Sequence, residues 1–216
     1  MQPVLCMIMD RRRFGERWGD ALVERARAAA EAGVHLIQVR ERGLETRELV
    51  RLVMRCVDAV AGTSARILVS DRVDVALAAG AHGVHLPAAG APPARLRPAM
   101  PAGFLIGRSV HDLNEGVRVA LDGGVDYLLF GTVFPTSSKP GRVAAGLDQL
   151  AAMVGAVPLP VLAVGGVTSD RASRIAATGA AGLAAIEMFA AGDLDLLRVR
   201  VYQASVAFDT LGRNSP

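Results

Sequence analysis

Short apolar segments alternate with amphipathic segments along the whole chain of 216 residues. The apolar segments have the length of strands, the amphipathic ones the length of helices, and the pair repeats about every 20–30 residues. Glycine follows several amphipathic segments directly, where helices commonly end. These three observations predict an α/β fold, a single-domain TIM (β/α)8 barrel that takes up residues 1–216.

Each predicted strand is a short run rich in Val, Ile and Leu. The predicted strands are Val4–Met9, His35–Glu41, Arg66–Ser70, Gly83–Leu86, Phe104–Arg108, Tyr127–Phe130, Val161–Val164 and Gly182–Ile186. A doubly wound open sheet is the alternative. It usually has fewer strands and a glycine-rich turn after the first one, whereas here Asp10 and three arginines follow.

The predicted helices show apolar residues at helical spacing. They are Glu16–Ala32, Thr46–Val60, Asp71–Ala79, Ala94–Met100, Leu113–Asp122, Leu147–Val154, Asp170–Thr178 and Leu194–Phe208. Gly33 directly follows the first of these helices and Gly179 the seventh, and each is a natural residue to end a helix. Asp112 with Glu115 three residues later resembles an N-terminal capping pair.

The composition excludes several classes of function. Hydrophobic residues make up 51% of the chain, but no apolar run is long enough to cross a membrane, and Asp10 comes too early for a signal peptide. The net charge is +3, and with 4% aromatics and no basic stripe we expect no nucleic-acid partner. Cys6 and Cys56 follow no pattern and indicate reduced thiols of a cytoplasmic protein. We expect a small-molecule ligand, with a homodimer left open.

In such a barrel the active site lies where strands run into helices. Along the second strand, Leu36, Gln38 and Arg40 alternate onto the inward face, so the polar pair lies at the mouth. Polar residues follow the other strands in the same way, among them Lys139, the single lysine of the chain. The candidate binding residues are Gln38, Arg40, Arg42, Ser70, Asp71, Ser109, Thr132, Thr136, Ser138 and Lys139.

The turns after the seventh and eighth strands are the usual place for a phosphate in barrels of this kind. Gly165 and Gly166 allow an anion close to backbone N–H groups, and Glu187 and Met188 follow the eighth strand. A tight turn explains the glycines equally simply. The loop with Thr136, Ser138 and Lys139 offers further donors, or is an ordinary surface loop.

His111 follows the fifth strand, two residues after the inward Ser109. This places an imidazole over the mouth, and an imidazole titrates near neutral pH. We therefore predict His111 as the general acid–base residue; a structural histidine is the alternative.

Taken together, the strand-end motifs resemble the thiamine phosphate synthase/TenI family. The matching stretches are Gln38-Val-Arg40-Glu-Arg42, Ser70-Asp71-Arg-Val-Asp74, Gly83-Val-His85-Leu, Ile106-Gly-Arg-Ser109-Val-His111, Asp126-Tyr-Leu-Leu-Phe-Gly131, Phe134-Pro-Thr136-Ser-Ser-Lys139 and Ala163-Val-Gly-Gly166. The resemblance implies a barrel with one of two activities. A synthase joins a pyrimidine diphosphate to a thiazole phosphate and expels pyrophosphate with Mg²⁺. A thiazole tautomerase moves a proton and needs no metal.

Departures from the synthase pattern favour the tautomerase. Ser70 stands where the synthase has Asn, and Arg42 where it has Lys. Gly90 stands at the second metal-binding carboxylate, so that Asp71 alone would hold a Mg²⁺–diphosphate complex poorly. We therefore expect a thiazole tautomerase-like isomerase of thiamin biosynthesis, with no metal and no cofactor. His111 would move the proton, and Mg²⁺ would be needed only by a synthase.

Under this resemblance Gln38, Arg40 and Ser109 would hold the ring and its carboxylate, and Gly166, the Glu187–Met188 loop and Lys139 the phosphate. Glu187 stands where the family's phosphate loop usually carries Ser, and its carboxylate would repel a phosphate. Two alternatives remain: thiamine-phosphate synthase, and a non-catalytic protein that binds thiazole or thiamin phosphates.

Overall fold

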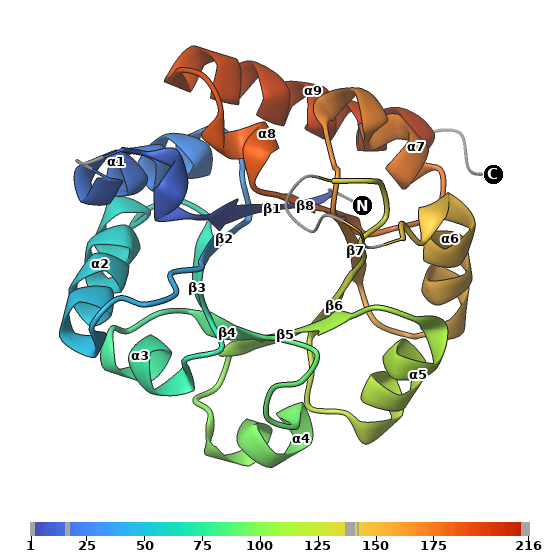
Figure 1. The fold of residues 1–216 in the computed structure, drawn as a ribbon, viewed down its shortest axis with the longest axis horizontal. Helices are drawn as coiled ribbons and strands as arrows, with labels where there is room; N and C mark the ends of the chain where they lie inside the picture. Colours follow the sequence, from blue (N-terminus) through green and yellow to red (C-terminus); the bar gives the residue numbers. More distant parts are fainter. Residues whose placement is uncertain (1–2, 16–17, 137–140, 142, 213–216) are drawn as a thin grey trace.

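A computed structural model describes residues 3–15, 18–136, 141 and 143–212. Within these residues, eight parallel strands form a closed barrel in sequence order, and helices surround it (Figure 1). The strands are β1 (Val4–Met9), β2 (Leu36–Val39), β3 (Arg66–Ser70), β4 (Gly83–Leu86), β5 (Leu105–Val110), β6 (Tyr127–Phe130), β7 (Val161–Val164) and β8 (Gly182–Ala185). The predicted TIM barrel is therefore confirmed.

The helices match the predicted positions with small shifts at their ends. They are α1 (Trp18–Glu31), α2 (Thr46–Ala59), α3 (Val73–Ala78), α4 (Pro93–Leu96), α5 (Leu113–Asp122), α6 (Gly146–Ala156), α7 (Ala172–Ala176), α8 (Glu187–Ala190) and α9 (Leu194–Gly212). Three 3₁₀ turns accompany them: η1 (Arg11–Arg13), η2 (Arg97–Ala99) and η3 (Ser169–Arg171). None of the helices in the described ranges is both long and apolar enough to span a membrane.

Four differences from the predicted boundaries concern the mouth or its surroundings. β2 ends at Val39, so Arg40 lies just beyond the strand, and β5 continues to Val110. The predicted helix at Ala94–Met100 divides into α4 and η2, where Pro98 interrupts regular hydrogen bonding. The helix α8 was not predicted, because four residues are too few to show helical spacing.

The barrel closes because β1 pairs with β8, with Val4 opposite Gly182. Its interior is filled by a small apolar cluster separate from the main core. That cluster consists of Cys6, Ile8, Leu36, Leu68, Tyr127, Leu129, Leu162 and Ala184. Each large apolar side chain buried in this way stabilises the fold by about 1.5–3 kcal/mol.

Gly107 makes room for one member of that interior cluster. It lies opposite His85 on β4 and opposite Tyr127 on β6, so it separates the two in the sheet. A Cβ at this position would lie 2.1 Å from Cζ of Tyr127. The missing side chain therefore lets the tyrosine ring reach across β5 toward His85.

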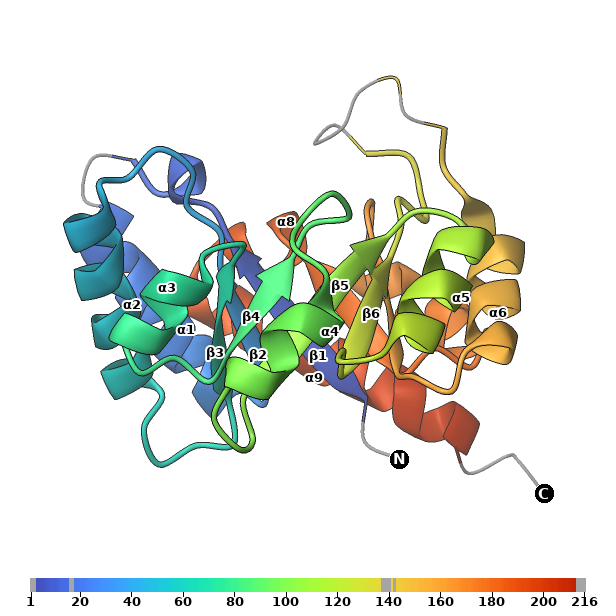
Figure 2. The ribbon, with the colours of Figure 1, turned by 90° about the horizontal axis from the view of Figure 1, so that it is seen from below.

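Figure 2 shows the barrel from the side, with the strands running upward toward the loops that form the mouth. The loops after each strand, together with α8, surround this end. The predicted site residues follow strand ends, so they gather here.

Candidate functional site

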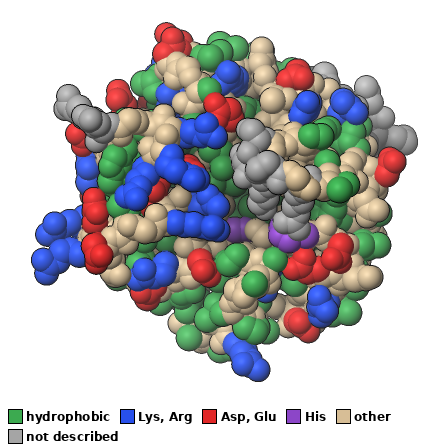
Figure 3. All heavy atoms as spheres, in the orientation of Figure 1, with side chains coloured by type: hydrophobic (Ala, Val, Ile, Leu, Met, Phe, Trp, Pro, Cys, Tyr) green, Lys and Arg blue, Asp and Glu red, His purple; other side chains and the backbone are tan. Residues whose placement is uncertain are grey.

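Positive side chains gather at the mouth over the ends of β1 and β2 (Figure 3). Asp10 follows β1 and is buried; its carboxylate accepts hydrogen bonds from the backbone N–H of Arg12 (3.1 Å) and from its Nε (2.8 Å). Nη1 of Arg40 lies 3.9 Å from the same carboxylate. The hydrogen bond from the Arg12 side chain is the main reason why the pKa of Asp10 is lowered. The Asp10 carboxylate thus holds the side chains of Arg12 and Arg40 at the mouth.

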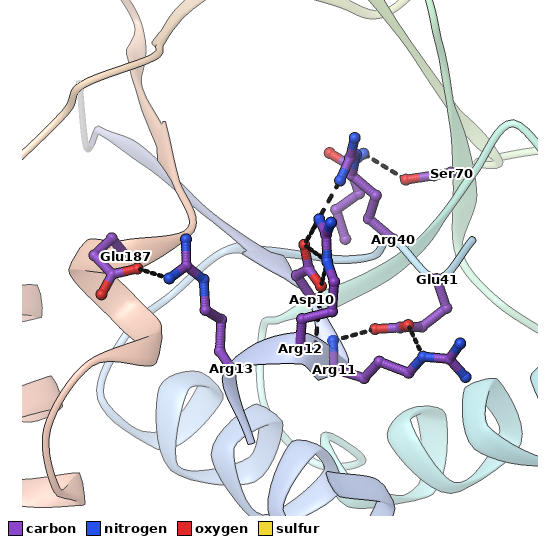
Figure 4. Close-up of polar contacts among 9 residues, drawn as sticks. Asp10, Arg11, Arg12, Arg13, Arg40, Glu41, Ser70 and Glu187 are labelled. Atoms are coloured by element: carbon purple, nitrogen blue, oxygen red, sulfur yellow. Dashed lines mark hydrogen bonds and ion pairs between the residues drawn. The ribbon is translucent and has the colours of Figure 1, made fainter. Parts of the chain in front are cut away.

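A second carboxylate joins the same two strand ends (Figure 4). Glu41 has a buried side chain, accepts a hydrogen bond of 2.6 Å from the backbone N–H of Arg11, and lies 3.5 Å from Nε of that residue. Burial raises the pKa of Glu41, and Arg11 opposes this effect. The pair joins the segment after β1 to the segment after β2, and its charges cancel.

The remaining arginines of this side, Arg12, Arg13, Arg40 and Arg42, form what we call the arginine rim. Arg42 is exposed and close enough to Arg40 for their charges to repel. Of these four arginines, Arg40 and Arg42 are among the binding residues predicted from the sequence. Arg12 and Arg13 were missed, because a basic run after a strand looks like any solvated loop. Arg12 contacts Asp10 after β1, and Arg13 contacts Glu187 after β8. The second contact forms only because the closed barrel brings β1 and β8 together.

Glu187, the first residue of α8, turns toward Arg13. Their Oε2 and Nη1 atoms lie 3.2 Å apart, and both side chains are exposed (Figure 4). The predicted repulsion between this carboxylate and a phosphate is therefore largely offset by a cation already in place. The side chain of the next residue, Met188, is buried. Its backbone carbonyl oxygen accepts a hydrogen bond from Nη1 of Arg200.

Inward-facing polar side chains line the mouth beside the arginine rim. Nε2 of Gln38 donates to Oγ of Ser70 over 2.6 Å, while its Oε1 is buried with no hydrogen-bond partner among the described residues. A buried amide oxygen without a partner costs free energy until a donor arrives. Gln38 is thus prepared to accept a hydrogen bond from an N–H or O–H group of a ligand.

A second polar group lies deeper, on β4, β5 and β6. Nδ1 of His85 lies 3.1 Å from the hydroxyl of Tyr127, and its Nε2 lies 2.8 Å from Oγ of Ser109. Burial, with a contribution from Arg108, lowers the pKa of His85 to about 3. His85 points into the barrel as the strand pattern predicts, but its link to the predicted binding residue Ser109 was not foreseen.

His111 lies just beyond β5 and is partly buried. Its Nδ1 lies 2.6 Å from the carbonyl oxygen of Gly131, and its backbone N–H donates to Oε2 of Glu115 over 2.7 Å. Because a carbonyl only accepts, Nδ1 carries a proton, and Nε2 is the ring nitrogen left for a ligand. Asp112 caps α5 by accepting from the backbone N–H of Glu115 over 2.8 Å, which confirms the predicted capping pair.

The double-glycine turn packs against the segment after β6. Gly165 has φ +96°, and a Cβ there would lie 2.7 Å from Cγ2 of Thr132; Gly166 has φ +63° and would meet the carbonyl oxygen of Pro135 at 2.5 Å. Only glycine fits both positions. Thr132 is itself buried against this turn. Thr136 lies at the edge of the described part of this loop, and the predicted Ser138 and Lys139 lie outside the described residues.

The third and fourth strand ends offer little for a metal ion. Asp71 is exposed with φ +63°, and the segment after β4, where the family has a second carboxylate, is held by Arg108, which donates to the carbonyl oxygens of Ala88 (2.6 Å) and Ala91 (2.9 Å). Within the described ranges, no group of three or more His, Cys, Asp or Glu side chains could hold a metal. Asp71 is thus the one carboxylate of the synthase pattern at these strand ends, and Mg²⁺ is usually held by one or two carboxylates together with substrate phosphates. Independence from any cofactor stays a prediction.

The comparisons with known proteins agree with one another. A family model described as "Thiamine monophosphate synthase" matches residues 5–189. A putative thiamine-phosphate synthase of Geobacter sulfurreducens is 42% identical over 186 residues, which cover 84% of each chain. The thiamine-phosphate synthase of Methanoculleus marisnigri is 40% identical over 165 residues, covering 74% of this chain and 76% of its own. The solved thiamine phosphate pyrophosphorylase of Pyrococcus furiosus covers 96% of both chains with 33% identity and a TM-score of 0.82.

These findings correct the prediction of a thiazole tautomerase. Relatives at 35–42% identity are named thiamine-phosphate synthase, and the solved structure with a TM-score of 0.82 is a pyrophosphorylase, so the synthase alternative is the better interpretation and the isomerase is wrong. The departures at Ser70, Arg42 and Gly90 favoured the tautomerase, but they weigh less than the agreement of the other strand ends with the synthase pattern. The fold, the strand-end motifs and the match over residues 5–189 place this chain in the thiamine monophosphate synthase/TenI family.

Proposed function

We propose that this protein is a thiamine-phosphate synthase, a transferase that joins a pyrimidine diphosphate to a thiazole phosphate. The thiazole nitrogen attacks the carbon that carries the diphosphate, and the carbon–oxygen bond breaks. Pyrophosphate leaves with the electron pair of that bond, and the ring nitrogen becomes cationic. The names of the relatives at 40–42% identity support this assignment.

The arginine rim is the observation in the structure that carries the proposal. A reaction that expels a diphosphate needs cations near the departing oxygens, and it needs no general base. Against the four arginines of the rim stand two carboxylates, Asp10 and Glu187. The rim therefore keeps an excess of positive charge. Each additional charge pair at about 4 Å is worth about 4 kcal/mol at an effective dielectric constant of about 20.

The positions of the other mouth residues suggest which of the two substrates each of them binds. Gln38 and Ser109 face the interior next to the arginine rim, so they suit the pyrimidine ring and its diphosphate. The turn at Gly165 and Gly166 lies beside the segment after β6 and suits the phosphate of the thiazole, with Thr136, Ser138 and Lys139 as further donors. His111 offers its Nε2 to a ring and is assigned to binding, since no proton has to be removed.

Asp71 is the one carboxylate of the family's synthase pattern that remains, and Mg²⁺ would reach the mouth bound to the diphosphate as part of the substrate. No step of the reaction is assigned to a resident ion. Burial raises the pKa of Cys6 and of Cys56 to about 12, so neither thiol is reactive. Both are free and buried, which supports a reducing compartment and a cytoplasmic location.

The direct test is to incubate the purified protein with both substrates and to measure pyrophosphate release and the joined product. We expect both, in equal amounts, and neither when the thiazole phosphate is omitted. Arg40→Ala should raise the KM for the pyrimidine diphosphate about tenfold or more, because a charge-assisted hydrogen bond is lost. Arg198→Ala, which breaks an exposed pair with Asp195 on α9, is the matched control.

A second candidate is a non-catalytic protein that binds the same phosphates. Glu187 favours it, because a carboxylate replaces the serine of the family's phosphate loop. Tight binding of the thiazole phosphate without pyrophosphate release under any condition tested would select this second candidate and exclude the synthase.

A further inference from the structure

Tyr127, His85 and Ser109 form a line of hydrogen bonds from the barrel interior to the mouth. They belong to three neighbouring strands, β6, β4 and β5, and the missing side chain of Gly107 is what allows the first two to meet. The ring planes of His85 and Tyr127 are tilted by 31° with their centroids 5.7 Å apart. Ser109 lies two residues beyond Gly107, one layer nearer the mouth.

The tyrosine determines which nitrogen of His85 carries the proton. The Tyr127 side chain is buried, and its hydroxyl has a single recorded partner among the described residues, Nδ1 of His85. If Nδ1 carried a proton, the phenol proton would point into an apolar interior without an acceptor, which is unfavourable. The phenol therefore donates to Nδ1, and the ring proton lies on Nε2.

The direction of the next hydrogen bond follows. Nε2–H of His85 donates to Oγ of Ser109, so the serine is an acceptor toward the interior. Its own proton has to point elsewhere. Ser109 is only partly buried, and the mouth is the open direction. A protonated, cationic His85 would give the serine the same role, but burial and the nearby Arg108 keep the ring neutral.

We propose that Tyr127 and His85 are positioning residues that orient the hydroxyl of Ser109 as a hydrogen-bond donor to an acceptor atom of the bound substrate. Ser109 is thereby neither activated as a nucleophile nor available to take up a proton. The inference rests on the proposed function only for the identity of the acceptor, which then belongs to the pyrimidine diphosphate. The direction of the hydrogen bonds belongs to the ligand-free protein.

The first experiment reads the tautomer directly. In protein labelled with ¹⁵N at histidine, long-range ¹H–¹⁵N spectra should show His85 neutral, with the proton on Nε2, at every pH from about 8 to 5. In Tyr127→Phe, which keeps the ring but removes the donor, the ¹⁵N resonance of Nδ1 should change, because its lone pair no longer accepts a hydrogen bond. Leu129→Val, in the same interior cluster, controls for packing and should leave the tautomer as in the wild type. A proton on Nδ1 in the wild type, or no change in Tyr127→Phe, overturns the proposal.

The second experiment tests whether the tyrosine acts through the serine. Ser109→Ala and Tyr127→Phe should each lower kcat of pyrophosphate release, by about tenfold for the serine and less for the tyrosine. The double variant should be no slower than Ser109→Ala alone. Independent, multiplying losses would overturn the proposal. If no variant and no wild-type sample turns over, the synthase assignment fails, while the spectra still decide the direction of the hydrogen bonds.

Discussion

Glu187, at the end of the mouth that we propose binds phosphate, is a carboxylate whose effect depends on its neighbour Arg13. It lies 3.2 Å from Arg13, which comes from the opposite end of the chain. The value of an exposed ion pair for stability is small, about 0–1 kcal/mol. Its effect on an arriving phosphate is larger, because the phosphate meets either a neutral pair or an uncompensated negative charge.

We expect Arg13→Ala to weaken binding of the thiazole phosphate at least about tenfold, because it leaves Glu187 without its cation. Arg13→Ala combined with Glu187→Ser should recover most of the loss, and the phosphate-free thiazole should bind equally to all variants. Isothermal titration calorimetry measures each affinity, with Arg198→Ala as the control. If the double variant binds as weakly as Arg13→Ala, Arg13 contacts the phosphate itself and the neutralising role of the pair is wrong.

His85 should make stability depend on pH. Its pKa is 6.5 in the unfolded chain and about 3 in the fold, so between these values the unfolded chain binds more protons. The free energy of unfolding therefore falls as the pH is lowered from 6.5 toward 3, by at most about 1.4 kcal/mol per pH unit from this residue. Denaturant unfolding at pH 7 and pH 5 should show a smaller difference for His85→Asn than for the wild type. Equal differences would show that His85 is not buried as a neutral ring.

At the scale of elements, two short helical segments at neighbouring strand ends build the side of the mouth that we propose binds phosphate. η1 follows β1 and α8 follows β8, and these strands pair directly. The main part of the barrel follows repeating spacing, but these two segments have only three and four residues. Local spacing could not reveal them, and they carry Arg13 and Glu187.

Gly107 is the position on β5 where an added side chain should lower the free energy of unfolding most clearly. A Cβ at 2.1 Å from Cζ of Tyr127 forces the ring or β5 to move, so Gly107→Ala should lower the free energy of unfolding by about 1–3 kcal/mol. Gly155→Ala is the matched control. Gly155 lies in α6 with open space where the Cβ would be, and alanine there should raise stability by up to about 1 kcal/mol. Chemical denaturation compares the two, and a neutral Gly107→Ala would contradict the packing described for the interior.

At the scale of the whole molecule, the chain carries a net charge of +3, and three acidic side chains near the mouth are paired with arginines. We therefore expect Mg²⁺ alone to show no saturable binding by calorimetry below about 1 mM. Binding should appear when pyrophosphate is present. Saturable binding of Mg²⁺ alone that Asp71→Asn removes would show that a resident metal site exists after all.

The sequence predicted the barrel because its signals are local and repeat around the ring. β3, β4, β6, β7 and α5 begin and end where expected, since turn residues or a capping pair mark their ends. Strand alternation also placed Gln38 and Ser109 correctly at the inward face. The contacts that it could not predict join side chains far apart in the chain, such as Arg13 with Glu187.

The predicted thiazole tautomerase activity was wrong. The tautomerase prediction depended on Ser70, Arg42 and Gly90, which depart from the synthase pattern, and Gly90 stands where that pattern has a carboxylate. The structure shows Arg108 holding the backbone of the same segment, so this region of the mouth is built with a cation beneath it. The replacement of one metal-binding residue does not identify a reaction without knowledge of the charged side chains around it.

The ring closure between β1 and β8 determines when the mouth can be completed during synthesis. A ribosome releases the end of β1 early, but its partner strand emerges only after more than four fifths of the 216 residues have been made. Until then Arg13 has no Glu187 to contact, and the side of the mouth proposed to bind phosphate is incomplete. In a nascent or prematurely terminated chain that stops before β8, β1 can still pair with β2, but its other edge has no partner strand. Such edges attract other strands, so we expect chains that stop before β8 to aggregate more readily than the full chain.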